Sequence, residues 1–449
     1  EAMAVVARSD TPVILMHMPG DDPATMQSLA TYDDVAVEVA RGDLSIDLVG
    51  NDALLTLATG FLRTLQAGKN IALTADDMDF KSGTNRLVGL NEINLRSHQG
   101  VWTYFLGSAA EDRYGNDYNE DGQTQATSPG MYLSGRDLAA LYNGFTHVRI
   151  GRAGLGNLMW LGDAKLATTV KMTGLARSSD SQESTFRDAT TLTSDEIIVA
   201  GDVRADNDVL NLVSRKLDVR SQNVQDGPGA PDSGLYARAL TLTASEQMLV
   251  GGWVKGLDSV TISVTGTPGD AGRSDAYYTP AYLADAGHNS LQLDQRGLIT
   301  SIRNGSTIAI DTLRSIETRG RIVVDGAGSS LALHAGGPLI VAEGSAISGE
   351  GNNIVLDMRS DDVVSINGNS AIRAGMKFVS PDPVNQPQNL IVPIVTGTAG
   401  TIILSAAKEM LLGGSVTATG DMTLSSSTQA YDNELYGQAR LAGGAINPA

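Results

Sequence analysis

The sequence contains no cysteine, which excludes disulfides, thiolate zinc sites and cysteine nucleophiles. Aromatic residues make up only 5% and charged residues only 18% of the 449 residues, so the composition does not indicate a large aromatic-rich globular core. Basic residues are also few: 32 Lys and Arg stand against 51 Asp and Glu, for a net charge of −19. Because an acidic surface repels phosphate backbones, nucleic acid is not an expected partner.

Long apolar runs are missing as well. No stretch approaches the roughly 20 apolar residues of a membrane span, and the chain opens at Glu1 without a basic and apolar leader. We therefore expect no membrane insertion within this segment. We also expect the sequence to be part of a longer secreted protein whose export signal and anchor lie outside it.

Glycine is plentiful, with 50 residues, and it accompanies an internal repeat. The segments Leu240–Ser263 and Ile402–Ser425 align without gaps. Each has an aliphatic-Thr/Ile-Leu-Thr/Ser-Ala run, a Met four residues after the Ala, a Gly-Gly pair, a Val and a second aliphatic run. Looser copies include Leu192 to Leu212 and Asn70 to Met78. A repeat of this length indicates a stacked, coil-like architecture.

The apolar residues of each copy alternate, as at Leu240, Leu242 and Ala244, which is the period of a half-buried strand. Equivalent strands recur after about one coil: Leu242 to Ile262 is a step of 20 residues. Further steps are 25 residues from Ser345-Ala-Ile347 to Ser370-Ala-Ile372, and 23 from Leu331 and Leu333 to Ile354 and Leu356. The Gly-Gly pairs at 251–252, 336–337 and 413–414 are expected to form corners with positive φ.

These motifs resemble the coils of filamentous-haemagglutinin-type proteins, which are giant bacterial surface proteins. The resemblance covers about residues 41–430. It implies an all-β fold, a right-handed parallel β-helix (solenoid), with a non-catalytic role in adhesion or matrix formation at the bacterial cell surface. The implied partners are other surface or matrix components, glycans or further copies of the protein. The Asn-Pro-Asn-Gly motif of two-partner-secreted members is absent from the sequence.

Residues 4–39 differ from the repeats. Pro12-Val-Ile-Leu-Met-His-Met-Pro-Gly20, Pro23-Ala-Thr-Met-Gln27 and Tyr32-Asp-Asp-Val35 resemble a short fragment of dihydropteroate synthase. In that family the Met-His-Met strand end, here Met16 to Met18, lies beside the pterin pocket, although Arg or Gln usually stands where this chain has Pro19. The resemblance covers fewer than 40 residues of a barrel that needs about 250. It therefore implies an inactive pterin-binding remnant, partly helical or disordered.

A section from 100 to 162 interrupts the repeats and is expected to be an irregular insertion. Within it, Asp117, Asn119 and Asp121, followed by Gly122, fit the first half of a calcium loop. The twelfth position of such a loop is Ser128 instead of the usual Glu, so a solvated acidic turn is the alternative. The stretch Ser134 to Tyr142 predicts a short helix that packs on the strands.

Parallel β-helices also include polysaccharide-active enzymes, whose catalysis requires carboxylates that converge on one face. The adjacent pairs Asp76-Asp77 and Asp361-Asp362 are the candidates, but neighbouring residues on a strand point to opposite faces. The five His residues show no metal-ligand spacing. We predict no catalytic or cofactor site.

The sequence thus predicts five segments: a fragment at 1–40, first coils at 41–99, an insertion at 100–162, further coils at 163–430 and a tail at 431–449. Three functional hypotheses compete for them. A structural or adhesive β-helix accounts for the repeats, the glycine content and the charge. A β-helical polysaccharide-active enzyme and a pterin-binding remnant each account for one local feature.

Overall fold

A computed structural model describes the chain in 17 segments with gaps between them. The described residues are 4–8, 13–17, 28–31, 36–48, 54–57, 61–65, 67–80, 86–107, 130–141, 145–152, 156–161, 164–165, 189–220, 234–265, 290–379, 392–426 and 440–441. Strands account for 65% of the structure and helix for 3%, so the fold is all-β. The chain divides into two compact units, residues 1–214 and 215–449.

Almost every element is a short strand. Up to residue 219 they are β1 (Ala4–Arg8), β2 (Val13–His17), β3 (Ser28–Thr31), β4 (Ala36–Arg41), β5 (Leu44–Leu48), β6 (Leu54–Leu57), β7 (Phe61–Thr64), β8 (Ile71–Thr74), β9 (Asp77–Asp79), β10 (Leu87–Val88), β11 (Glu92–Arg96), β12 (Thr103–Leu106), β13 (Met131–Leu133), α1 (Gly135–Ala140), β14 (His147–Gly151), β15 (Leu158–Leu161), β16 (Ala164–Lys165), β17 (Ala189–Thr193), β18 (Glu196–Val199) and β19 (Asp202–Val219). The remaining strands are β20 (Gly234–Val250), β21 (Trp253–Val264), β22 (Ser290–Leu293), β23 (Leu298–Ser301), β24 (Thr307–Thr312), β25 (Ser315–Thr318), β26 (Arg321–Asp325), β27 (Ser330–Ala335), β28 (Leu339–Val341), β29 (Ala346–Glu350), β30 (Val355–Ser360), β31 (Val364–Ile366), β32 (Ala371–Ala374), β33 (Met376–Val379), β34 (Val392–Val395), β35 (Thr401–Ala406), β36 (Met410–Leu412), β37 (Ser415–Ala418), β38 (Met422–Ser426) and β39 (Arg440–Leu441).

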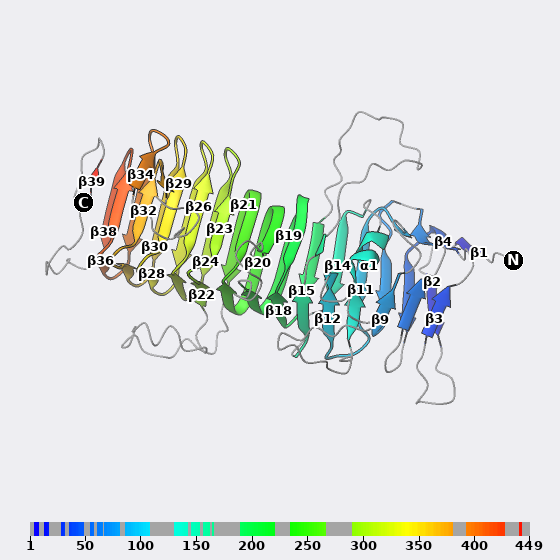
Figure 1. Cartoon of the computed structure of the whole chain (residues 1–449). Coiled ribbons are helices and arrows are strands. Elements are labelled where there is room, and N and C mark those ends of the chain that lie inside the picture. The colour runs from blue at the N-terminus through cyan, green and yellow to red at the C-terminus, as the bar shows by residue number, and fades with distance from the viewer. Residues whose placement is uncertain are drawn as a thin grey trace, which may run out of the picture. The chain divides into compact units, whose positions relative to one another are not determined.

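The second unit is built from three parallel ladders, each of which joins a strand to one in the next repeat (Figure 1). One ladder runs β22–β25–β28–β31–β36, a second runs β23–β26–β29–β32–β37, and a third runs β24–β27–β30–β35–β38. The long strands β20 and β21 add segments to these same ladders. Strands adjacent in sequence therefore belong to different ladders.

The interior of the second unit consists of aliphatic columns. In the third ladder Ile310, Leu333, Met358 and Leu404 are direct partners along four successive strands, and each is at most 2% exposed. Burying one such side chain stabilises the fold by roughly 1.5–3 kcal/mol. The alternation that puts these residues inside places the residues between them on the outer face.

The repeat alignment from the sequence is confirmed in register. Leu242 pairs with Ile262, and Leu404 pairs with Leu424, so both copies lie on the third ladder with the same step. The step of 25 residues that relates Ile347 to Ile372 is confirmed as well.

The predicted step of 23 residues after Leu331 is wrong. Leu331 pairs with Leu356 rather than with Ile354, which makes the step 25. The corner before β29 takes up the two extra residues: the step is still 23 from Thr318 to Val341 but is 25 from Arg321 to Ala346, and Gly344 turns between them with a positive φ of 79°.

The Gly-Gly corners differ from the expectation in their backbone. Both amides of 251–252 donate to the Val219 carbonyl, and both amides of 413–414 donate to the Ile366 carbonyl. None of these glycines is among the described residues with positive φ. The constraint is close approach instead: a Cβ on Gly414 would lie 2.6 Å from the Ser370 Oγ, and one on Gly336 would lie 2.3 Å from the Leu313 carbonyl oxygen.

The first unit repeats the parallel pairing from its first strand. The sequence predicts that residues 1–40 are partly helical or disordered, but the described parts, β1, β2 and β3, are strands that pair in parallel with β4, β5 and β6. Farther on, β14 and β15 pair with β11 and β12. Within residues 100–162, the section expected to be irregular, the described strands β12, β13, β14 and β15 thus all take part in parallel pairs.

The predicted short helix is confirmed as α1. Ser134 caps its first turn in a reciprocal capping box with Asp137, and the helix contacts β13 and β16. Among the described residues no helix has the length and apolar character needed to cross a membrane.

Candidate functional site

The outer face of the third ladder carries two rows of side chains in register. One row is Thr261, Ala309, Ala332 and Asp357, and the other is Ser263, Asp311, His334 and Arg359. They come from four neighbouring strands, β21, β24, β27 and β30. Parallel strands lie about 4.8 Å apart, so each residue is within reach of its partner in the next strand.

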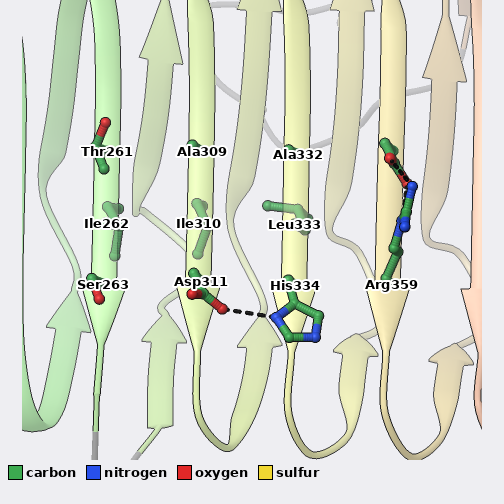
Figure 2. A pocket seen from close by; sticks show the side chains of 11 residues that line it. Thr261, Ile262, Ser263, Ala309, Ile310, Asp311, Ala332, Leu333, His334 and Arg359 are labelled. Carbon is green, nitrogen blue, oxygen red and sulfur yellow. Dashed lines mark hydrogen bonds and ion pairs between the residues drawn. The ribbon is translucent and has the colours of Figure 1, made fainter.

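These eight residues, together with Ile262, Ile310 and Leu333 between the two rows, line a hollow of about 380 Å³, which we call the trough (Figure 2). Ala309 and Ala332 are exposed and carry only a methyl group. The outer surface is therefore depressed at these two residues relative to the longer side chains on either side. The trough is thus a shallow depression with an aliphatic floor and a polar rim.

His334 is held between two carboxylates. Its Nδ1 lies 2.8 Å from Asp311 Oδ1 and its Nε2 lies 3.4 Å from Asp361 Oδ1. The hydrogen bond to Asp311 is the main reason that the pKa of His334 is raised above its usual value, and the bond to Asp361 acts in the same direction. The imidazole links three successive repeats of the outer face.

Arg359 forms the wall at β30. Its Nε and Nη2 donate to the two oxygens of Asp357 at 2.9 and 2.7 Å, a two-pronged pair within one strand. This pairing raises the pKa of Arg359. The charges of the rim are therefore balanced when His334 is protonated: His334 and Arg359 face the two rim carboxylates, Asp311 and Asp357.

The adjacent carboxylates Asp361 and Asp362, which the sequence offers as catalytic candidates, differ in exposure. Asp361 contacts His334 from beside the trough, with 66% of its side chain exposed, whereas Asp362 is buried and its Oδ1 lies 3.0 Å from the Lys408 ammonium. The two adjacent carboxylates, which follow the end of β30, therefore lie in different environments.

Asp76 and Asp77 are buried and serve the architecture. Asp76 accepts hydrogen bonds from the backbone N–H and the side chain of Gln99 at 3.1 Å. Asp77 accepts from the backbone N–H of Met78 and of Tyr132. Carboxylates satisfied by backbone donors hold segments together and do not face a substrate.

The proposed calcium ligands Asp117, Asn119 and Asp121 lie outside the described residues. In the part of the chain that the structure describes, no group of three or more His, Asp or Glu side chains is arranged to hold a metal ion.

The apolar repeat pattern of the sequence did not indicate the trough, although the spacing of its charged residues along the chain could have done so. Asp311 and His334 are separated by 23 residues, which is the step between paired strands of successive repeats, and Arg359 follows His334 by one further step of 25. Charged pairs adjacent in sequence are the obvious candidates, whereas stacked repeats bring together residues one coil apart. The residues that define the site also lie outside the apolar motif.

The fold and the trough define an all-β protein of parallel ladders with a shallow, polar-rimmed hollow on the outer face of one ladder. Comparison with protein family models, with curated proteins and with solved structures gives no match to this chain.

Proposed function

We propose that the chain is a right-handed parallel β-helix in which each coil contributes one strand to each of three ladders. The observation that carries this proposal is the pairing of strands one repeat apart, together with the continuous column Ile310, Leu333, Met358 and Leu404. Parallel strands joined by crossover connections are right-handed in nearly all proteins. Coils that cannot fold singly gain stability from their neighbours in such a stack.

We propose further that this β-helix is a non-catalytic structural and adhesive segment of a large extracellular bacterial surface protein. The resemblance of Leu240–Ser263 and Ile402–Ser425 to filamentous-haemagglutinin-type coils supports this role. So do the absence of cysteine and the net charge of −19, which favours solubility outside the cell. Its partners would be surface or matrix components, glycans or further copies of the chain, and the trough is the surface best suited to contact them.

The β-helix is tested by circular dichroism and amide hydrogen exchange. We expect a β-dominated spectrum and slow exchange at the ladder amides of β24, β27 and β30, because each lies between two neighbouring strands. A mostly helical spectrum, or exchange of these amides as fast as in an unfolded chain, would contradict the fold.

The adhesive role is tested with beads that carry the purified chain. Coated beads should be retained on bacterial extracellular matrix more than beads that carry albumin, another acidic protein. Equal retention of the two bead types would refute adhesion, whatever the fold.

A polysaccharide-active enzyme is the second candidate, because Asp311 and Asp361 converge on one face. Their joint contact with the His334 imidazole favours a binding role, since a glycosidase needs its two carboxyl groups on opposite sides of a scissile bond. Release of reducing ends from a polysaccharide panel, and its loss in Asp311→Asn, would establish catalysis.

We assign the N-terminal strands to the first coils rather than to a pterin-binding remnant. This assignment rests on the parallel pairing of β1, β2 and β3 with β4, β5 and β6. Saturable binding of a pterin to the chain in calorimetry would overturn it.

A further inference from the structure

We infer that the trough binds one or two sugar units of a neutral hexose chain. This inference rests on the proposed binding role of the outer face and specifies its ligand.

The size and form of the trough suit a sugar ring. Its volume of about 380 Å³ falls near the lower end of the roughly 300–1,000 Å³ range of small-molecule sites. The methyl groups of Ala309 and Ala332 are register partners on adjacent strands, so their spacing is about 4.8 Å. That distance is close to the length of one pyranose in an extended chain, and the two methyl groups offer an apolar floor to its C–H face.

The rim supplies the hydrogen bonds that hydroxyl groups need. Thr261 and Ser263 provide hydroxyls at β21, and Asp311 with His334 provides acceptor and donor atoms on the middle strands. Asp357 with Arg359 does the same at β30. Each sugar hydroxyl both donates and accepts, so it can join such pairs without leaving a charge unpaired.

The charge of the rim and of the whole chain favours a neutral sugar chain over an anionic one. The rim carboxylates are largely balanced by His334 and Arg359, and the chain as a whole has a net charge of −19. An anionic polysaccharide would bring like charge to this surface, and to reach a cation it would have to displace a carboxylate from Arg359 or from His334.

None of the described residues that line the trough is Phe, Tyr or Trp, so one sugar chain is held weakly, with a Kd on the order of 1 mM. Repetition compensates for weak single sites, because several copies of the protein on one surface engage a polymer together. Binding is therefore best measured both with short soluble chains and with beads that carry many copies.

The experiment uses the full chain and two matched variants, Ala309→Arg and Thr307→Arg. Both residues are exposed on the outer face of β24, but only Ala309 lines the trough. The probes are tetramers of glucose, mannose and galactose, and a galacturonate tetramer. Saturation-transfer NMR and retention on polysaccharide-coated beads give the affinity and the avidity.

We expect at least one neutral tetramer to bind. Its affinity should fall at least about tenfold in Ala309→Arg, which fills the trough, and should stay within about twofold in Thr307→Arg. Circular dichroism of both variants establishes that they are folded. Three results would each overturn the inference: no binding of any neutral tetramer, tighter binding of galacturonate, or equal loss in both variants. The β-helix and bead-retention tests stand apart from these outcomes, so the ligand can be wrong while the scaffold and its adhesive role are right.

Discussion

Carboxylates occupy two opposite environments in this chain. In the first unit a group near α1 is buried, with each residue less than 9% exposed: Asp76, Asp77, Asp79 and Asp137. In the second unit Asp311 and Asp361 stand on the outer face with 73% and 66% of their side chains exposed. Residues of the same type thus serve the architecture in one place and a surface site in the other.

The partners of the two groups explain the difference. Buried Asp77 and Asp137 accept hydrogen bonds from the backbone N–H groups of Tyr132 and Phe80, which are 55 and 57 residues away in the sequence. They attach the segment around α1 to the strands. Asp311 and Asp361 bond to the side chain of His334, which can exchange its partners for a ligand. A carboxylate that accepts hydrogen bonds from backbone amides stabilises the fold and has no free acceptor capacity on those bonds for a ligand.

The largest effect should follow from Asp137→Ala. Its carboxylate accepts from Phe80 N at 2.7 Å, Ser134 N at 2.9 Å and Ser134 Oγ at 2.6 Å. Without it the capping box is lost and a buried amide has no acceptor, so we expect a loss of about 3 kcal/mol of local stability. Hydrogen exchange of the α1 and β13 amides measures it. Asp361→Ala is the exposed control and should lower the stability by less than about 0.5 kcal/mol. Similar losses of stability in both variants would contradict the distinction between buried structural carboxylates and exposed ones.

Asp77→Ala should destabilise the same region by about 2 kcal/mol, because the Met78 and Tyr132 amides both lose their acceptor. Urea denaturation followed by Tyr and Trp fluorescence gives the change in the free energy of unfolding. Asp77→Asn keeps one carbonyl oxygen and should recover part of the loss. If Asn were as damaging as Ala, charge rather than hydrogen bonding would be the stabilising factor.

The smallest effect concerns His334 and its pH dependence. Because its pKa is raised chiefly by the hydrogen bond to Asp311, NMR titration should give a value above the reference of about 6.5. A raised pKa in the folded state contributes stability that is complete below about pH 6.5 and is lost as the pH rises through the folded value. In Asp311→Asn the pKa should fall and this pH dependence should shrink. An unchanged titration curve would show that Asp311 does not hold the imidazole.

The sequence predicts the interior far better than the surface. It pairs Leu242 with Ile262 correctly, because aliphatic residues must repeat in register wherever parallel strands of successive repeats pair along one buried face. It aligns Leu331 two residues too early, since Ile354 is also buried and resembles a strand residue, although it precedes β30. The corners can differ in length without changing the pairing of the buried aliphatic residues. The length of a corner therefore cannot be derived from the apolar pattern.

The trough lies beyond that pattern for a related reason. Outward residues are not constrained by packing, so Asp311, His334 and Arg359 share no residue type that a repeat search could align. Their proximity can be recognised in the sequence only when the number of residues between paired strands is known. Once the step is known, the sequence alone tells which outward residues lie side by side on neighbouring strands.

The antiparallel hairpin β33–β34 lies between β32 and β35 in the chain, yet β35 still pairs with β30 in full register. An inserted segment is therefore carried by one corner without disturbing the stack. For protein engineering, this corner is a natural grafting point: a peptide epitope or a small folded module inserted between β33 and β34 should leave the register of β30 and β35 unchanged.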